Sequence, residues 1–208
     1  LPRVFPYRRL HPTGTYWNRA QLTRFLDRVN GRCVVVLDEA YYEFVDPTVR
    51  TESLQWPERY PNLIIARTFS KAYGLAGLRI GYGISSIEVA DLLNRVRQPF
   101  NSNMLALAAA EAALDDADYL TQTIAVNNAG MAQLTAAFKS LGLDWIPSSG
   151  NFVSVDVAQH ALPLYEALLQ KGVIVRPVAN YEMPNHLRVS DPGTVEGPPD
   201  RQDVSLRV

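Results

Sequence analysis

The stretch of sequence that decides the fold is residues 62–82, NLIIARTFSKAYGLAGLRIGY. It begins with an apolar run that predicts a buried strand over residues 62–67, and its end predicts a further strand over residues 78–83. Between them lies a glycine-rich turn that carries Lys71. Because α/β folds place ligands in loops at the carboxyl ends of buried strands, this pattern indicates a ligand site at the turn.

The turn has the side chains of a phosphate site. Thr68 and Ser70 supply hydroxyl donors, the glycine-containing loop supplies backbone N–H groups, and Arg79 supplies a fixed cation. Lys71 adds an amine nucleophile. The alternative interpretation of Lys71 is a surface lysine in a turn that precedes an ordinary strand.

A second informative stretch is residues 33–43, CVVVLDEAYYE. Its apolar run lacks polar alternation, which predicts a strand over residues 33–37 that is buried on both faces. Asp38 then lies at the end of a buried strand, where a carboxylate needs a cationic partner such as a protonated pyridine nitrogen. Tyr41 could turn its hydroxyl toward the same site. The alternative is an Asp38 that caps the following helix.

Outward from these stretches, short apolar strands alternate with amphipathic helices, which is typical of the α/β class. No regular element is predicted for residues 1–11, and the Pro- and Gly-rich residues 191–208 are predicted to be an irregular tail. A first helix is predicted between Asn18, as its N-cap, and Gly31. The other predicted helices span residues 86–97, 103–114, 119–141 and 162–170. The other predicted strands span residues 145–146, 152–157, 173–175 and 187–189.

Composition narrows the possible functions. The 208 residues are 47% hydrophobic and carry a net charge of −1, so no basic field favours a nucleic-acid partner. Mean hydropathy is −0.09, and no apolar run is long enough to span a membrane. The single cysteine, Cys33, excludes a disulfide framework, and the histidines lack metal-ligand spacing, so no metal site is expected. We expect a soluble, cytoplasmic protein in which only Lys71, Lys139 and Lys171 offer an amine.

The motifs resemble those of the pyridoxal-phosphate-dependent aminotransferases of fold type I, and most closely the histidinol-phosphate aminotransferases. The strand-Asp-x-x-Tyr pattern at Asp38 and Tyr41 and the Ser-Lys-x-x-Gly pattern at Ser70 and Lys71 occur in the family's order. Weaker matches follow in residues 97–101, 149–152, 172–176 and 186–190. The resemblance implies part of a three-layer αβα cofactor domain over residues 1–115 and a small α+β domain over residues 116–190.

The resemblance also implies roles for individual residues. Lys71 would form the Schiff base with pyridoxal 5′-phosphate and move the proton at the substrate. Asp38 would pair with the pyridine nitrogen, and Tyr41 would bond the phenolic oxygen of the cofactor. Three residues would hold its phosphate: Thr68, Ser70 and Arg79. Three would bind the substrate: Arg188, as a clamp on a carboxylate, Arg176 and Asn151.

The function that the resemblance implies is amino transfer between histidinol phosphate and 2-oxoglutarate in histidine biosynthesis, by a protein that is a homodimer in its full-length form. The alternatives are a related threonine-phosphate decarboxylase, a non-catalytic ligand-sensing domain, and an inactive fragment. Both ends depart from the family pattern, since His11 stands where the family has an asparagine and residues 191–208 lack a final helix. We therefore expect a C-terminal portion that lacks the N-terminal half, and the loss of the pattern at both ends is consistent with either reading-frame shifts or an artificially altered sequence.

Overall fold

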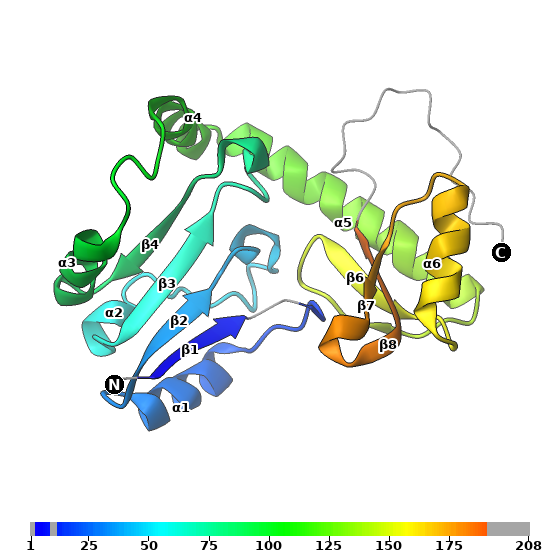
Figure 1. Cartoon of the computed structure of the whole chain (residues 1–208), viewed down its shortest axis with the longest axis horizontal. Helices are drawn as coiled ribbons and strands as arrows, with labels where there is room; N and C mark the ends of the chain where they lie inside the picture. Colours follow the sequence, from blue (N-terminus) through cyan, green and yellow to red (C-terminus); the bar gives the residue numbers. More distant parts are fainter. Residues whose placement is uncertain (1–2, 9–11, 191–208) are drawn as a thin grey trace.

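The first sheet of the molecule has four strands in the order β1-β2-β3-β4 (Figure 1). The computed structural model describes residues 3–8 and 12–190. The strands are β1 (Arg3–Arg8), β2 (Cys33–Asp38), β3 (Leu63–Thr68) and β4 (Gly81–Ser85). The first three are parallel, and β4 runs antiparallel to β3. Parallel strands joined through helices confirm the predicted α/β class.

Helix α1 (Arg19–Val29) covers one face of this sheet. It begins at the predicted N-cap, where the Asn18 side chain accepts from the Gln21 N–H and the Gln21 side chain accepts in return from the Asn18 N–H. Leu22 and Leu26 point inward with the short helix α2 (Trp56–Arg59). The core that results contains Leu22, Leu26, Cys33, Val35, Leu37, Trp56, Tyr60, Leu63 and Ile65.

The opposite face of the sheet is only half-buried, which corrects the prediction of a strand buried on both faces. Along β2, buried Val35 and Leu37 alternate with half-buried Val34 and Val36, and Ile64 of β3 repeats the pattern. An apolar run therefore does not by itself show that both faces are covered, since the second face depends on elements elsewhere.

Two predictions for this sheet need correction, one for a strand that was not expected and one for the start of a strand that was. Residues 3–8 form β1, although no element was predicted there, because each pairs with a residue of β2 from the Arg3–Cys33 pair onward. Pro6 is compatible with β1 because the strand lies at a sheet edge. The strand predicted over residues 78–83 begins only at Gly81, since Ala76–Leu78 form a 3₁₀ turn, η2, and Arg79 has a left-handed φ of 55°.

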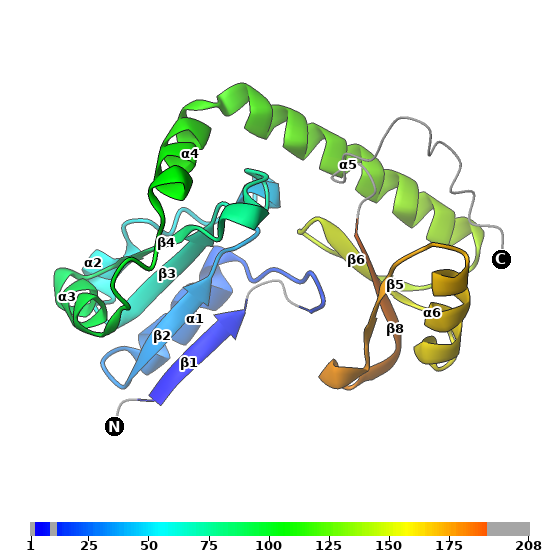
Figure 2. The same ribbon diagram turned by 45° about the horizontal axis from the view of Figure 1, so that its top comes forward.

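Three helices lead away from β4 (Figure 2). They are α3 (Ile87–Val96), α4 (Met104–Asp115) and α5 (Ala117–Ser140). One residue, Asp116, separates α4 from α5, and its side chain caps α5 by accepting from the Tyr119 N–H at 2.9 Å. The outer surface of α3 and α4 is apolar, because Ile87, Val96 and Met104 are each at least 78% exposed. None of the helices within residues 12–190 is long and apolar enough to cross a membrane.

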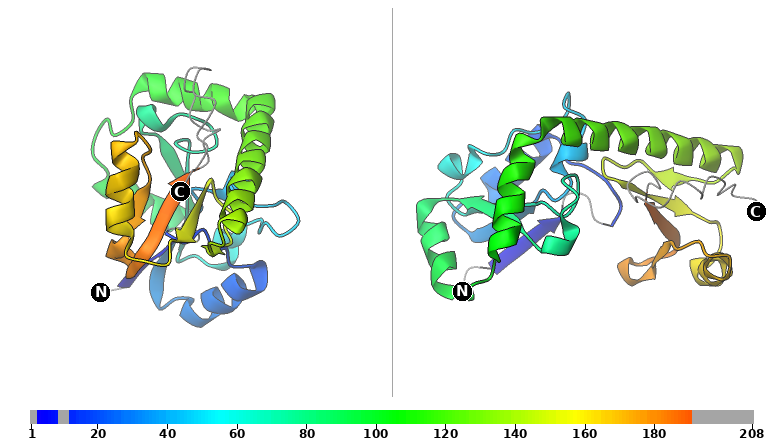
Figure 3. Two further views of the ribbon diagram at one scale, coloured as in Figure 1. Left: turned by 90° about the vertical axis from the view of Figure 1, so that its right-hand side faces the viewer. Right: turned by 90° about the horizontal axis from the view of Figure 1, so that it is seen from above.

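The second sheet has the strand order β5-β6-β8-β7, with antiparallel pairing throughout. Its strands are β5 (Trp145–Ile146), β6 (Phe152–Asp156), β7 (Arg176–Val178) and β8 (Met183–Ser190). Helices α5 and α6 (Ala161–Gln170) pack against it (Figure 3), and Leu134, Phe138, Val153, Val155 and Leu187 share one core. The strand predicted over residues 173–175 is wrong, because the chain pairs with β8 only from Arg176 onward.

The turn at residues 12–16 joins the two sheets. The Ser149 N–H donates to the Gly14 carbonyl at 2.9 Å, and the Ser154 hydroxyl donates to the Pro12 carbonyl at 3.1 Å. Gly14 has a φ of 81°, and a Cβ there would lie 2.1 Å from Ser148 Oγ. Only glycine fits this close approach without a shift of the backbone. The predicted tail, residues 191–208, and His11 lie outside the described residues.

Candidate active site

The carboxyl ends of β2 and β3 lie at the same edge of the first sheet. Asp38, the last residue of β2, is the register partner of Ala66 of β3. Its Oδ1 accepts from the Ala40 N–H at 3.1 Å, so one carboxylate oxygen orders the chain that leaves the strand. Asp38 is half-buried and ends β2 beside β3, the strand whose chain continues into the Lys71 turn.

The lysine turn is held by hydrogen bonds between residues close together in the sequence. The Ser70 N–H donates to Thr68 Oγ1 at 3.1 Å, and the Gly74 N–H donates to the Lys71 carbonyl at 3.0 Å. Gly74 has a φ of 70°, and a Cβ on it would lie 2.4 Å from the Tyr119 hydroxyl. This close approach explains the glycine three residues after the lysine.

Lys71 lies over an aromatic pair that crosses to the second sheet. Its Nζ is 5.0 Å from the ring centroid of Tyr41, and the Tyr41 and Phe152 centroids are 5.4 Å apart in an edge-to-face contact. The guanidinium of Arg188 lies 4.9 Å from the Phe152 centroid. The structure therefore brings an amine from the first sheet and a guanidinium from β8 onto one aromatic pair.

Asn151 and Arg176 lie beside this arrangement. Asn151 is half-buried next to Gly150, where a Cβ would lie 3.4 Å from the Phe152 ring and 3.6 Å from the Tyr41 ring. Arg176 begins β7 and is the register partner of Arg188. Residues directly opposite in an antiparallel pair share a face, and like charges there repel, so an anion between them would relieve the repulsion.

Arg79 and Thr68 are placed less favourably for a phosphate. The exposed Arg79 uses one Nη to donate to the Ala76 carbonyl at 2.9 Å. Thr68 Oγ1 lies 3.4 Å from the Ile80 carbonyl and also accepts from Ser70. Within residues 12–190, the hydrogen bonds of these two side chains go to neighbouring turn residues and not to Lys71 or Asp38, so the structure does not bring the whole predicted set together.

A buried ion pair lies next to these residues, and neither of its two members is among the predicted site residues. The Arg67 guanidinium donates to Glu39 Oε2 at 3.0 and 3.1 Å, and the Ser53 hydroxyl lies 2.8 Å from both Glu39 oxygens. Burial alone would lower the pKa of Arg67, but the Glu39 carboxylate, followed by Tyr82, raises it above its ordinary value. Arg67 therefore stays charged. The sequence did hold a signal for this pair, because Glu39 directly follows Asp38 and Arg67 directly precedes Thr68.

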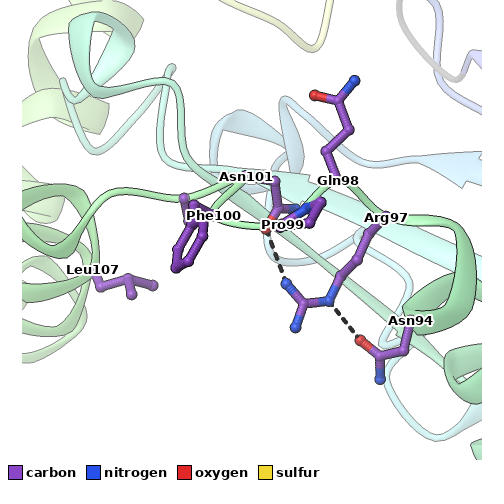
Figure 4. A pocket seen from close by; sticks show the side chains of 8 residues that line it. Asn94, Arg97, Gln98, Pro99, Phe100, Asn101 and Leu107 are labelled. Carbon is purple, nitrogen blue, oxygen red and sulfur yellow. Dashed lines mark hydrogen bonds between the residues drawn. The ribbon is translucent and has the colours of Figure 1, made fainter.

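Two surface hollows lie away from the lysine. One, of about 630 Å³, lies between the end of α3 and the start of α4 (Figure 4), where Arg97 donates to Asn94 and Asn101. A second, of about 480 Å³, borders the joining turn at Thr15 and Tyr16. Neither hollow contains Lys71, and the groups with site chemistry gather around that lysine instead. Among the described residues, no group of three His, Cys, Asp or Glu side chains is arranged to hold a metal ion.

The fold and the lysine turn define a class of protein. The family described as aminotransferase class I and II matches residues 10–196, so the chain belongs to this family. The partial α/β fold of a fold type I aminotransferase, predicted from the motifs, is thereby confirmed.

More particular relatives are the histidinol-phosphate aminotransferases. The chain is 57% identical over 180 residues to histidinol-phosphate aminotransferase 2 of Pseudomonas fluorescens, a match that covers 86% of this chain and 49% of the relative. The crystal structure of histidinol-phosphate aminotransferase from Sinorhizobium meliloti in complex with pyridoxal-5′-phosphate has a TM-score of 0.84 at 31% identity and covers 92% of this chain and 54% of that one. The chain spans about half the length of the relatives it matches.

A third similar protein shares the fold alone. The crystal structure of L-threonine-O-3-phosphate decarboxylase from Porphyromonas gingivalis has a TM-score of 0.79 at 23% identity, covering 94% of this chain and 60% of that one. At this identity the likeness concerns the fold, so it does not favour decarboxylase activity for this chain.

Proposed function

We propose that this chain carries the lysine site of an aminotransferase that moves an amino group between histidinol phosphate and 2-oxoglutarate, with pyridoxal 5′-phosphate as cofactor. The observation that supports this most directly is the Lys71 amine 5.0 Å from the ring of Tyr41, which in turn packs on Phe152 beneath Arg188. A nucleophilic amine and a cation that can bind an anionic group thus lie against one aromatic pair, which supports chemistry between an amine and an oxo acid at this place.

The residues around Lys71 fit the chemistry of the cofactor. Asp38 offers a carboxylate at the end of a strand, Tyr41 a hydroxyl, and Ser70 a hydroxyl beside the lysine. When bound, pyridoxal phosphate supplies an aldehyde that reacts with amines and a ring that withdraws electrons from the substrate. The fit is weaker at the phosphate, because Arg79 is exposed and donates to its own turn.

Each residue has a proposed task. Lys71 binds the aldehyde through its amine and accepts and returns a proton at the substrate's Cα. Asp38 holds a proton on the ring nitrogen, and Tyr41 donates to the ring oxygen. Thr68, Ser70 and Arg79 bind the phosphate, while Arg188, Arg176 and Asn151 orient the substrate by its anionic group.

The division of the chain is also a proposal. We infer a partial cofactor domain over residues 1–115 and a small domain over residues 116–190, supported by the two separate sheets. We further propose a cytoplasmic enzyme that works as a homodimer in its full-length form, as the family resemblance implies. We expect low activity from this chain, because it spans about half the length of its relatives.

The test is a titration of the chain with pyridoxal phosphate, followed by absorption spectroscopy. We expect a new visible band in the wild type that is lost in Lys71→Ala and in Lys71→Arg, which keeps the charge. Lys139→Ala and Lys171→Ala are matched controls, because they remove the only other lysines and both are exposed. Reduction with borohydride and peptide mapping should place the label on Lys71.

A wild type without the band, or a band that survives in both Lys71 variants, would contradict the proposal. The substrate is tested separately by following oxo-acid formation with histidinol phosphate and 2-oxoglutarate. Release of carbon dioxide from threonine phosphate would instead support the decarboxylase alternative.

A further inference from the structure

The buried pair of Glu39 and Arg67, together with Ser53, ties the two strands that precede the proposed cofactor residues; we call these three residues the Glu39–Arg67 clip. Glu39 is 1% exposed, the Arg67 side chain is 8% exposed, and Ser53 is fully buried. Two N–H groups of the guanidinium reach the same carboxylate oxygen, and the Ser53 hydroxyl lies 2.8 Å from each carboxylate oxygen. Buried charges in such a network hold a narrow geometry.

Each charged residue of the clip is a sequence neighbour of a proposed site residue. Glu39 follows Asp38, and Arg67 precedes Thr68, at the carboxyl ends of β2 and β3. The Glu39 N–H donates to the Ala66 carbonyl at 2.8 Å, which extends the pairing of the two strands past Asp38. A displacement of either partner would therefore move the segments that carry Asp38 and Lys71.

The clip also fixes the segment that carries Tyr41. The Glu39 carbonyl accepts from the Tyr42 N–H at 3.0 Å, which closes the turn with Tyr41 inside it. The Arg67 guanidinium lies 3.6 Å from the Tyr42 ring centroid, and Arg50 contacts the same ring at 4.7 Å. The ring of Tyr42 is thus held by two cations, immediately next to the tyrosine on which Lys71 lies.

Stability alone is a poor explanation for this arrangement. Removing two charges from water is costly, and apolar residues of similar volume often replace a buried ion pair with no loss of stability. Geometry is the property that an apolar pair would not supply, because only the charged pair has directional bonds between fixed atoms.

We propose that Glu39 and Arg67 are positioning residues, which set the spacing of Asp38, Tyr41 and Lys71 for the cofactor without touching it. This inference rests on the proposed function. Because bound groups lose affinity and rate when their partners are displaced by about 1 Å, loss of the clip should weaken cofactor binding even in a stable fold.

The experiment compares cofactor affinity with thermal stability in three variants of the chain. Glu39→Gln removes the negative charge that the buried Arg67 guanidinium contacts and should lower both the melting temperature and the affinity. The double variant Glu39→Leu with Arg67→Met replaces the pair by apolar side chains and should restore the melting temperature, while the affinity for pyridoxal phosphate stays at least tenfold weaker than in the wild type. Arg67→Lys keeps the charge and should recover part of the affinity.

Asp91→Asn is the matched control. It breaks the exposed Asp91–Arg95 pair on α3 and should change neither affinity nor absorption maximum. The proposal is overturned if the double variant, or Glu39→Gln where the double variant does not fold, binds pyridoxal phosphate as the wild type does. A wild type without a Lys71-dependent band would overturn the proposed function itself, whereas a normal band insensitive to the clip overturns only this inference.

Discussion

Glu43 is a carboxylate buried in the 3₁₀ turn Tyr42–Phe44, with Glu39 and two arginines nearby. Burial raises the pKa of Glu43 above its ordinary 4.5, and the charge of Glu39 adds to the rise, while Arg67 and Arg50 oppose it. The folded chain therefore binds this proton more tightly than the unfolded chain. Its contribution to stability is complete below about pH 4.5 and is lost as the pH rises through the folded pKa.

Removal of this charge should stabilise the protein at neutral pH. We expect Glu43→Gln to raise the melting temperature at pH 7 by about 2–4 °C, which corresponds to about 1 kcal/mol for a chain of this size. The difference should shrink toward pH 4, where the wild-type carboxyl is protonated. Thermal unfolding across this pH range measures it.

Glu166→Gln on α6 is the control, since Glu166 is exposed and should show no such trend. A lower melting temperature for Glu43→Gln at pH 7 would show that the attraction of Arg67 and Arg50 exceeds the cost of burial.

At the scale of elements, the turn at residues 12–16 allows a prediction about the stability of the contact between the two sheets. Gly14 and Gly31 both have a positive φ, 81° and 70°, but a Cβ would clash with Ser148 only at Gly14. We expect Gly31→Ala to cost about 1 kcal/mol, for the left-handed backbone alone. Gly14→Ala should cost at least about 2 kcal/mol more, as for overpacking.

Denaturant unfolding of the two variants isolates the contact, because the backbone penalty is common to both. Equal losses of stability would mean that the chain around Ser148 moves aside at little cost. That result would argue against tight packing between the turn and the chain around Ser148.

Elements with local signals could be predicted from the sequence, and elements made by pairing could not. Asn18 and Gly31 predict the two ends of α1 to within about two residues, because capping and helix-ending signals depend only on residues next to the helix end. The strand at residues 3–8 was missed because its sequence has no apolar period and it forms only by pairing with β2. The exposed Ile174 lies in an apolar run that predicts a strand, yet pairing with β8 starts two residues later.

The candidate site divides in the same way. Lys71 and Asp38 could be proposed from the sequence, because each follows an apolar run at the end of a strand. Phe152 could not, since its place at the site depends on its contact with Tyr41, and the sequence places Arg67 and Glu39 beside the site without showing that they pair. Only the folded chain brings those partners together.

At the scale of the whole molecule, the apolar surface of α3 and α4 predicts self-association. Ile87, Phe100 and Met104 are 89%, 97% and 82% exposed, and the half-buried sheet face adds to the apolar area. Large exposed apolar patches mark surfaces that become covered. We expect the sedimentation coefficient and the melting temperature to rise with protein concentration, because association stabilises the associated form by mass action.

The double variant Val96→Lys with Leu105→Lys should weaken this dependence at least severalfold. Ile174→Lys is the matched control, because Ile174 is 82% exposed but lies near the second sheet. A purely monomeric wild type over a hundredfold range of concentration would contradict the expectation.

The single-residue break at Asp116 has a mechanical consequence. Helix α5 has 24 residues, so it is a stiff rod about 36 Å long whose far part carries the second sheet. A rotation of about 5° at Asp116 would displace the far end by about 3 Å. The contact between Tyr41 and Phe152 therefore depends on the angle at which this rod leaves Asp116, while the hydrogen bonds from Ser149 and Ser154 to the turn at residues 12–16 limit how far that angle can change.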